Sequence, residues 1–561
     1  MKRFLSIFVI VVVCCLLVGV LVACGGSHTC VDTTIDHRCD ICDKVLTTCS
    51  DTDNNHLCDI CGETIITCVD DNANHNCDIC NKELSTCLDE NADNECDICG
   101  LTFELLDNDT YEITGYNGTA SNLQIPSTIL GKPVTIIGRI AFWRCYTLIS
   151  VVIPNSVTSV GENAFGHCYN LTSVVIGECV EDMDEYAFNY CLSLVEVYNL
   201  SSLNFTKGSE DNGYVGYYAL DIYTSLDAPS KLSTDSNGYI IYTNGEEKLL
   251  VGYAGSETEL TLPSDITSIN VGAFIAHVDL TNVIIGNSVK NIGFAAFASC
   301  TSLTSIVIPD SVTSIGMSAF NDCVSLTSVV IPNSITNIGD IAFANCDSLT
   351  SVYYTGTIDQ WVQIEFSDYA ANPLYDAKNL YINNELVTEA NITTATSIKA
   401  YAFRNCDSLT SVTIGNSVTS IGDYAFSGCS NLTSVVIPDS VTNIGDGAFY
   451  DCDSLTRVTI GNSVTNIGDR AFSSCDSLTS VVIGNSVTNI GDDAFYKCDS
   501  LTNVVIGNGV TSIGSSAFSG CASLTVINYV GTKAEWDNIE KGSSWDFGTG
   551  NYTIYYDYEI E

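Results

Sequence analysis

Apolar residues recur along most of the chain with a period of 23 residues, as in 434–456 (SVVIPDSVTNIGDGAFYDCDSLT). Each repeat contains Leu-x-x-Val-x-Ile, then Val-x-x-Ile-Gly, then Ala-Phe-x-x-Cys. The first run predicts a strand that buries Leu455, Val458 and Ile460 and exposes the residues between them. Gly445 is expected to turn the chain, and Asp446 to cap the short helical turn that carries Phe449.

A fixed period of this length predicts a solenoid built from one supersecondary unit per repeat. Burial of the apolar side chains of one repeat contributes roughly 10–20 kcal/mol, at ~1.5–3 kcal/mol each. Ordering its backbone costs more, at ~1–2 kcal/mol per residue. No repeat is therefore expected to fold alone, and neighbouring repeats must stack. The predicted fold has parallel β-strands, short second strands and helical turns.

One position of the repeat is a cysteine in all but one of thirteen copies. We expect these side chains to form a buried column of small hydrophobes, with no redox or metal role. His277 replaces one of them and is interpreted as a local packing substitution. The positions are Cys145, Cys168, Cys191, His277, Cys300, Cys323, Cys346, Cys406, Cys429, Cys452, Cys475, Cys498 and Cys521.

Aspartates also recur at repeat spacing, in the rows Asp423/Asp446/Asp469/Asp492 and Asp453/Asp476/Asp499. Each like-charged pair costs roughly 0.8 kcal/mol at ~5 Å in water, before screening. Solvation can offset that cost. A weakly bound divalent cation is the alternative hypothesis.

The order of these motifs resembles the BspA-type (Treponema-like) leucine-rich repeat over most of residues 104–561. The resemblance implies a leucine-rich repeat solenoid, curved or flattened and right-handed. It also implies a bacterial surface protein involved in adhesion.

Two irregular segments and a C-terminal stretch interrupt the period. They divide the chain into 104–352, which contains a Tyr-rich island at about 192–270, an insert at 353–395, a second repeat block at 396–527 and a cap at 528–561. The insert and the cap share a Tyr-x-Gly-Thr…Trp motif around Trp361 and Trp536. Such a shared motif predicts a buttress over exposed apolar ends.

The tyrosines of the Tyr-rich island form either a small core of their own or a contact surface, because Tyr is enriched at interfaces. The strand positions are nearly identical in every repeat and offer little discrimination. Specificity is therefore expected in the irregular segments. The candidate partner-binding residues are Tyr214, Tyr217, Tyr218, Tyr223, Tyr239 and Tyr242.

The first 23 residues are typical of an export signal, with Lys2 and Arg3 before an apolar stretch at 4–20. Leu21-Val22-Ala23-Cys24 resembles a bacterial lipobox, which implies lipidation of Cys24. An uncleaved membrane anchor is the alternative, since about 20 apolar residues can span a bilayer. Either way the remaining chain is expected outside the cytoplasm, on the cell surface.

Residues 24–103 form a Cys-rich stalk of four 19-residue repeats with too few apolar residues for a core. Covalent or metal cross-links must therefore order it. Plain disulfides are natural in an exported protein. Zinc is a second possibility, because successive Cys-x-x-Cys pairs have zinc-ribbon spacing. The cysteines concerned are Cys30, Cys39, Cys42, Cys49, Cys58, Cys61, Cys68, Cys77, Cys80, Cys87, Cys96 and Cys99.

Calcium together with disulfides is the favoured interpretation of the Cys-rich stalk. Oxygen side chains recur at loop positions suited to a hard cation. The pattern resembles thrombospondin type 3 repeats and differs from an EF-hand, which has Gly at position 6 and Glu at position 12. The candidate ligands are Asp32, Asp36, Asp40, Asp51, Asp53, Asn55, Asp59, Asp70, Asn72, Asn74, Asp78, Asp89, Asn91, Asp93 and Asp97.

Acidic residues outnumber basic ones by 67 to 20, for a formal charge of −47. This argues against nucleic acid and anionic lipid as partners, so membrane contact is expected only through the anchor. We find no motif of a catalytic site, and no cofactor is required. The leading hypothesis is a non-enzymatic surface protein that binds an extracellular protein. The first alternative is a glycan-binding module that stacks sugars on Trp361, Trp536 and the island tyrosines, and an envelope hydrolase is the second. The oligomeric state stays open.

Overall fold

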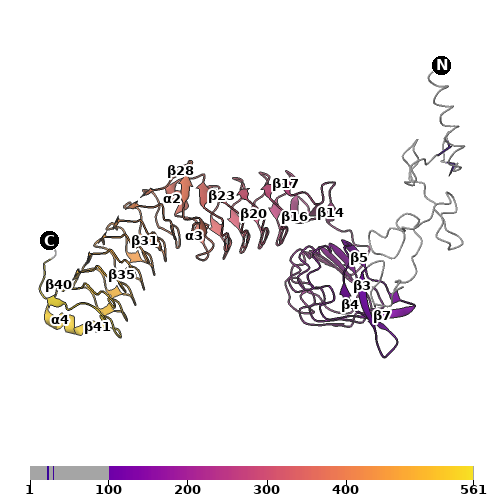
Figure 1. Ribbon diagram of the computed structural model, residues 1–561, viewed down its shortest axis with the longest axis horizontal. Coiled ribbons are helices and arrows are strands. Elements are labelled where there is room, and N and C mark those ends of the chain that lie inside the picture. Colours follow the sequence, from indigo (N-terminus) through magenta and orange to yellow (C-terminus); the bar gives the residue numbers. More distant parts are fainter. Residues whose placement is uncertain (1–21, 24–28, 31–99, 560–561) are drawn as a thin grey trace, which may run out of the picture. The chain divides into compact units, whose positions relative to one another are not determined.

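The computed structural model describes residues 22–23, 29–30 and 100–559 (Figure 1). The chain divides into two compact units between Pro229 and Ser230, here called unit 1 and unit 2. Near the N-terminus, β1 (Val22–Ala23) and β2 (Thr29–Cys30) form an antiparallel pair. The remaining strands belong to the repeats and to the segments that flank them.

The 23-residue period folds as the predicted parallel solenoid. Each complete repeat supplies one strand to each of two sheets, and paired residues in neighbouring repeats lie 23 positions apart. Val435 pairs with Val458 in one sheet, and Ile444 pairs with Ile467 in the other. Repetition in the sequence is therefore repetition in space.

Unit 1 contains one pair of sheets, to which each complete repeat supplies one strand apiece. Its five-stranded sheet contains β5 (Asn122–Gln124), β8 (Ser150–Val152), β10 (Ser173–Ile176), β12 (Glu196–Asn199) and β13 (Asp221–Tyr223). Its six-stranded sheet contains β3 (Leu101–Leu105), β4 (Tyr111–Tyr116), β6 (Thr128–Ile129), β7 (Lys132–Ile137), β9 (Ser159–Val160) and β11 (Asp182–Met183).

Unit 2 contains two successive pairs of sheets. The first pair has an eight-stranded sheet, β14 (Leu232–Thr234), β15 (Tyr239–Asn244), β16 (Glu247–Tyr253), β18 (Ser268–Ile269), β20 (Asn291–Ile292), β22 (Ser314–Ile315), β24 (Asn337–Ile338) and β26 (Glu365–Phe366). Its seven-stranded partner contains β17 (Glu259–Thr261), β19 (Asn282–Ile284), β21 (Ser305–Val307), β23 (Ser328–Ile331), β25 (Ser351–Tyr354), β27 (Leu380–Ile382) and β28 (Glu385–Leu386).

The second pair of sheets in unit 2 starts within the last residues of the insert, at β29. Its eight-stranded sheet contains β29 (Glu389–Ile392), β30 (Ser411–Ile414), β32 (Ser434–Val436), β34 (Arg457–Thr459), β36 (Ser480–Ile483), β38 (Asn503–Ile506), β40 (Val526–Tyr529) and β42 (Thr553–Tyr555). Its six-stranded partner contains β31 (Ser420–Ile421), β33 (Asn443–Ile444), β35 (Asn466–Ile467), β37 (Asn489–Ile490), β39 (Ser512–Ile513) and β41 (Glu540–Lys541).

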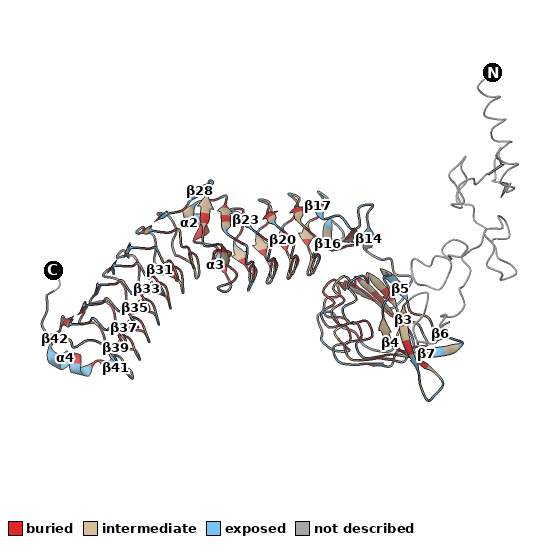
Figure 2. Ribbon diagram, in the orientation of Figure 1, coloured by how far each residue is buried: buried red, intermediate tan, exposed pale blue. Residues whose placement is uncertain are grey.

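The repeat positions predicted to be apolar form the core, as the burial colouring shows (Figure 2). Leu455, Val458 and Ile460 are buried, and the residues between them are exposed. The phenylalanines stack one per repeat, and the rings of Phe449 and Phe472 lie nearly parallel with centroids 5.2 Å apart. Unit 1 and unit 2 each have a separate core of this kind.

The repeat cysteines form the predicted buried column, in which only Cys145 is partly exposed. Each buried thiol except Cys406 donates to a phenylalanine carbonyl of the preceding repeat, as from Cys452 Sγ to Phe426 O at 3.2 Å. The thiol of Cys406 instead lies 3.5 Å from the hydroxyl of Ser408. Burial raises the pKa of Cys452 well above its ordinary value. The column is therefore a set of neutral hydrogen-bond donors inside an apolar core.

Both units begin with the same hairpin arrangement. In unit 1 the hydroxyl of Tyr116 accepts the amide of Ala120 at 3.0 Å. In unit 2 the hydroxyl of Tyr253 accepts the amide of Glu257 at 3.2 Å. Gly238 packs so closely against Gly255 that a Cβ added to Gly238 would lie 2.7 Å from the backbone nitrogen of Gly255. Part of the predicted Tyr-rich island is therefore the opening hairpin of unit 2.

The insert and the C-terminal stretch contain matching helical modules. α2 (Ile358–Trp361) and α4 (Lys533–Asn538) both start with a capping box, at Thr357 and Thr532 respectively. Trp361 packs edge-on against Tyr354 at 5.2 Å, and the equivalent pair in the second module has the same spacing. A further turn, α3 (Leu374–Ala377), belongs to the insert alone.

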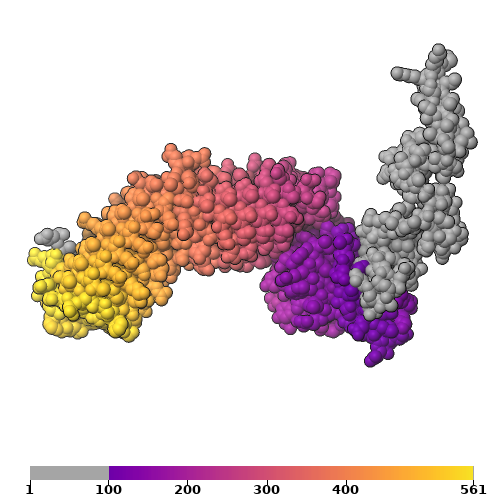
Figure 3. Space-filling view, in the orientation of Figure 1, coloured from indigo at the N-terminus to yellow at the C-terminus, as the bar shows by residue number. Residues whose placement is uncertain are grey.

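The insert joins the two halves of unit 2 into one core. Trp361 Nε1 donates to the carbonyl of Ala402 at 2.8 Å, and Asn372 Nδ2 donates to the same oxygen at 3.2 Å. One hydrophobic cluster accordingly runs from Tyr239 to Ile539. The surface of unit 2 also continues without a gap across the insert (Figure 3). The insert, which was predicted to be a buttress over exposed apolar ends, therefore lies inside unit 2 between two blocks of repeats.

The prediction that Asp446 caps its own turn is wrong. Its Oδ1 accepts the backbone amide of Asp469, one repeat further on, at 2.9 Å. Asp469 does the same for Asp492 at 2.8 Å. Because Gly447 has φ 57°, the chain turns away directly after Asp446. The aspartate row therefore links neighbouring repeats by hydrogen bonds.

Candidate functional site

The predicted lipidation site Cys24 and the candidate calcium, zinc and disulfide residues of the Cys-rich stalk lie outside the described residues, apart from the backbone of Cys30 in β2. Within the described part of the chain, no group of three or more His, Cys, Asp or Glu side chains could hold a metal ion. The aspartate rows of unit 2 are included in that statement.

The structure distributes the six candidate tyrosines over two units. Tyr214, Tyr217, Tyr218 and Tyr223 belong to unit 1, and Tyr239 and Tyr242 belong to unit 2. Tyr239 and Tyr242 are only 4% and 3% exposed, so they are core residues and cannot form part of a contact surface. Tyr223 lies on β13, where its ring stands 4.9 Å from that of Tyr198.

The two tryptophans proposed as sugar platforms are also buried. Trp361 is 0% exposed and Trp536 is 5% exposed. Their ring faces are covered by the modules they hold together, so neither can stack on a sugar. This form of the glycan hypothesis is wrong.

The remaining tyrosines belong to a larger aromatic surface on the turns of unit 1, which we call the aromatic edge. Its members come from successive turns around the repeat cysteines and are half-buried or exposed. They are Trp143, Tyr146, His167, Tyr169, Tyr186, Tyr190, Tyr214, Tyr217 and Tyr218.

The N-terminal half of the aromatic edge is built around His167. Its ring stacks on Tyr190 at 4.7 Å and meets Trp143 edge-on at 4.4 Å. His167 Nδ1 and the hydroxyl of Tyr169 share a hydrogen bond of 2.8 Å. Gly166 leaves room for the indole, because a Cβ there would lie 2.6 Å from the Trp143 ring.

The charge state of this half follows from its surroundings. Partial burial and then the nearby Arg144 guanidinium lower the pKa of His167, so the imidazole is neutral near pH 7. Arg144 lies over the Trp143 ring at 5.6 Å. Tyr146 and Tyr190 are 40% and 46% exposed. Flat apolar faces next to one cation are therefore available to a ligand.

The C-terminal half of the aromatic edge is tyrosine alone. Tyr186 and Tyr214 stack with centroids 5.5 Å apart. Tyr217, which is 38% exposed, contacts Tyr214 at 5.5 Å and Tyr218 at 4.8 Å. The pKa of Tyr214 is raised to about 12, first by desolvation and then by its hydrogen bond to Glu210. Aromatic faces and carboxylates therefore lie side by side here.

Sequence reasoning missed most of the aromatic edge, although a signal was present. The residue before the repeat cysteine is Arg144, His167 or Tyr190 in unit 1. In the later repeats it is small or polar, as at Ser299, Asp322, Asn345, Asn405, Gly428, Asp451, Ser474, Lys497 and Gly520. Alignment of the repeats by this position would have identified the difference.

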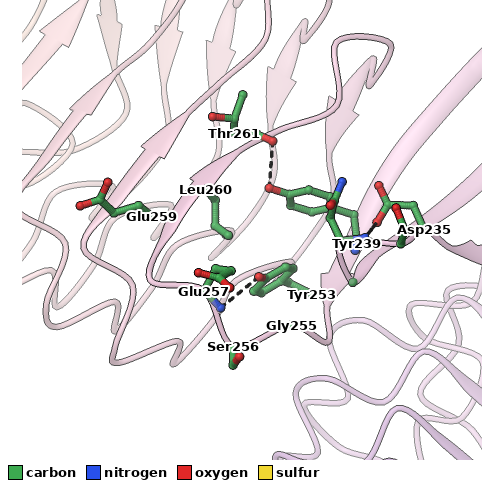
Figure 4. Close-up of a pocket in the computed structure, with 12 residues that line it drawn as sticks. Asp235, Tyr239, Tyr253, Gly255, Ser256, Glu257, Glu259, Leu260 and Thr261 are labelled. Carbon is green, nitrogen blue, oxygen red and sulfur yellow. Dashed lines mark hydrogen bonds between the residues drawn. The ribbon is translucent and has the colours of Figure 1, made fainter.

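A cavity of 700 Å³ opens beside the first hairpin of unit 2 (Figure 4). Tyr239 and Tyr253 form part of its lining, and Glu257 and Glu259 lie near its mouth. Both phenols are used internally, since Tyr239 donates to Thr261 O at 2.9 Å and Tyr253 accepts from Glu257. The cavity therefore follows from the hairpin, and its lining includes the three carboxylates of Asp235, Glu257 and Glu259.

The described residues include two histidines, and neither is paired with a nucleophile. His167 bonds to a phenol, and His277 Nε2 lies 3.3 Å from the carbonyl of Tyr253. The ring of His277 packs edge-on against Phe274 at 5.7 Å, which fits its interpretation as a packing substitution. The described residues thus offer surfaces for binding, with no arranged acid, base and nucleophile.

Comparison with known proteins gives a family match. The model of the BspA type leucine rich repeat region matches in six copies over residues 116–210, 253–370 and 396–525, more than half of the chain. Among curated proteins nothing matches. No helix in the described ranges is both long and apolar enough to cross a membrane.

Similar solved structures include three bacterial proteins. A leucine rich cell surface protein from Faecalibacterium prausnitzii is 27% identical, with 78% of this chain and 95% of that chain covered and a TM-score of 0.32. A leucine-rich repeat protein from Bacteroides ovatus is 22% identical, with 81% and 98% covered and a TM-score of 0.35. The pneumococcal vaccine antigen PcpA is 15% identical, with 83% and 98% covered and a TM-score of 0.37.

Proposed function

Because the chain belongs to the family of BspA-type leucine-rich repeat proteins, we propose that it is a non-enzymatic bacterial surface lipoprotein whose solenoid binds an extracellular protein and mediates adhesion. The observation that supports this most directly is the aromatic edge of unit 1. Four of its rings, Tyr146, His167, Tyr169 and Tyr190, flank the repeat cysteines at positions that carry no aromatic residue in the repeats of unit 2. Tyrosine and tryptophan supply large contact area at low entropic cost, which is why interfaces are enriched in them.

In this proposal unit 2 and the Cys-rich stalk present unit 1. The strand positions of unit 2 repeat Thr and Ser from one repeat to the next, as at Thr433 and Thr456, and offer little discrimination. The stalk, which ends before β3 begins at Leu101, is a spacer ordered by calcium and disulfides, with zinc as the alternative metal. Lipidation of Cys24 tethers the chain to the outer face of the membrane.

A glycan ligand is the second candidate, and one observation favours it. Tyr146 and Tyr169 stack nearly parallel at 5.3 Å and leave part of their faces exposed. Flat aromatic faces of this kind can contact the apolar side of a sugar ring. The site for the glycan would then be the aromatic edge, since the buried tryptophans are excluded.

Binding of the full-length chain, displayed on bacterial cells, to immobilised matrix proteins and glycans tests the proposal. The test variant is Tyr146→Ser with Tyr190→Ser. The matched control is Tyr450→Ser with Tyr496→Ser, two half-buried turn tyrosines of unit 2. We expect saturable protein binding that the first pair abolishes and the control retains, and that free sugars do not compete.

Other outcomes separate the alternatives. Binding to glycans alone, with the same loss in the first variant, would establish the second candidate. Binding that both variants retain but a calcium chelator removes would place recognition in the Cys-rich stalk. No binding to either panel would refute the adhesion proposal. Loss of surface lipoprotein in Cys24→Ala, measured by membrane fractionation and fatty-acid labelling, tests the anchor separately.

A further inference from the structure

Unit 2 contains an arginine held by tyrosine rings. Tyr401 and Tyr424, one repeat apart, stack at 5.8 Å with their planes within 4°. The guanidinium of Arg404 lies 5.4 Å from the Tyr424 centroid. It also lies 5.5 Å from Tyr369 and 6.0 Å from Tyr375. These are cation–π distances, so this fold can bind a guanidinium between its turns.

Aromatic faces account for most of the environment of Arg404. Its Nε is buried and has no hydrogen-bond partner among the described residues. One other nitrogen lies 3.4 Å from the hydroxyl of Ser427. Its contacts with the three tyrosines are therefore the main interactions that hold this charge in place.

Unit 1 has the same tyrosine pair at the same position of the repeat, but without the arginine. Tyr186 and Tyr214 stack at 5.5 Å. The Asn189 amide donates to Tyr186 O at 2.9 Å, just as the Arg404 amide donates to Tyr401 O at 3.0 Å. Asn189 thus takes the place of Arg404. Its short neutral side chain supplies no cation for the rings.

Two carboxylates lie beside the tyrosine pair of unit 1, where unit 2 has an arginine. The pKa of Tyr186 is raised chiefly by its hydrogen bond to Glu185, and the pKa of Tyr214 is raised first by desolvation and then by its hydrogen bond to Glu210. Glu185 and Glu210 form no ion pair with a described residue. The cation described above beside the aromatic edge, Arg144, lies at the other half, over Trp143. Tyrosine faces beside carboxylates that form no ion pair are complementary to a cation.

We propose that Tyr186, Tyr214 and Tyr217, together with Glu185 and Glu210, bind an arginine side chain of the partner protein. This inference rests on the proposed function and specifies the partner as a protein with an exposed basic segment. A planar guanidinium can stack on tyrosine and pair with carboxylates at once, which an ammonium does less well. The formal charge of −47 steers such a segment toward the chain.

The first experiment measures the affinity of the full-length chain for a nona-arginine peptide at physiological ionic strength. In Asn189→Arg the new side chain is placed to lie against Tyr214 as Arg404 lies against Tyr424 in unit 2. Gln124→Arg adds the same charge on the exposed strand face of β5 and is the matched control. We expect Asn189→Arg to bind about 3- to 30-fold more weakly than the control, the range that a cation–π contact supplies.

A second pair of variants does not depend on the fit of a new arginine. Glu185→Gln with Glu210→Gln should weaken binding more than Glu178→Gln with Glu181→Gln, which removes two exposed charges elsewhere in unit 1. A nona-lysine peptide should bind the wild-type chain more weakly than nona-arginine. Equal affinities within both variant pairs would show that the peptide recognises net charge alone, and would overturn the inference.

The same variants on immobilised matrix proteins distinguish this inference from the proposed function. Matrix binding that is lost in Tyr146→Ser with Tyr190→Ser but unchanged in Asn189→Arg would leave the function standing and refute the arginine site. Absence of matrix binding in the wild-type chain would refute the function, while the peptide comparison would still decide the arginine site.

Discussion

In the aspartate row of unit 2, charge repulsion and hydrogen bonding have opposite effects on the stability of the turn. Asp446 lies between Asp423 and Asp469 in neighbouring repeats, about one strand spacing, ~5 Å, from each. Each like-charged pair costs about 0.8 kcal/mol in water and roughly half of that at physiological salt. Removal of the charge alone should therefore stabilise this turn slightly.

The hydrogen bond acts in the opposite direction. Asp446 Oδ1 accepts the amide of Asp469 at 2.9 Å, and an exposed bond of this kind contributes about 0.5–1.5 kcal/mol. Asp446→Asn removes the charge and keeps an acceptor, whereas Asp446→Ala removes both. The difference between these two variants isolates the hydrogen bond, because the charge change is the same.

Hydrogen exchange of the Asp469 amide, measured by mass spectrometry on the full-length chain, is the direct assay. We expect this amide to exchange about 2- to 12-fold faster in Asp446→Ala than in Asp446→Asn. Added salt should protect it more in the wild type than in either variant. Equal exchange in the two variants would refute the role of the row as a hydrogen-bonded link between repeats.

Three further predictions concern the core, the second aspartate row and the insert. In the native chain, Cys179 should react with a maleimide while Cys452 and the other buried column thiols do not, because the core shields them from the reagent and burial also raises the pKa of Cys452; mass spectrometry of labelled peptides checks this. The pKa of Asp476 is raised by partial burial and by Asp499 and Asp453. Protonation of Asp476 therefore stabilises the folded chain fully below the pKa of the unfolded state, and this stabilisation is lost as pH rises through the pKa of the folded state. Asp476→Asn should therefore not destabilise the chain near pH 7, and its advantage over wild type in urea unfolding should disappear on acidification; a clear loss at pH 7 would contradict the assignment. Trp361→Ala should cost about 3–5 kcal/mol and split the calorimetric unfolding of unit 2 into two transitions, whereas Trp536→Ala should destabilise without such a split.

The sequence alone determined the solenoid and most of its core. A repeat that recurs every 23 residues places each position in the same environment in every turn, so the burial of Leu455 or Cys452 follows from the pattern. Covering one repeat with the next is the only way to bury faces that a single repeat leaves exposed. The family resemblance rests on the same residues and was confirmed.

The tertiary structure decided which residues of different repeats lie next to each other. The acceptor for the Asp469 amide is Asp446 of the preceding turn, which no local capping rule indicates. The Tyr-rich island divides between two units, because Tyr253 closes a hairpin and Tyr214 stacks on the turn before it. Trp361 is buried because the insert folds against the next repeat and bonds to Ala402.

The aromatic edge shows both contributions together. Its residues are visible in the sequence, but they come from turns that are 23 or more positions apart and become one surface only when the turns stack. Likewise, Asn189 is recognised as the counterpart of Arg404 only when the stacked tyrosine pairs of the two units are compared. Local sequence sets which side chains are available, and contact between repeats sets which of them act together, since the stabilising interactions of a solenoid lie between neighbouring repeats.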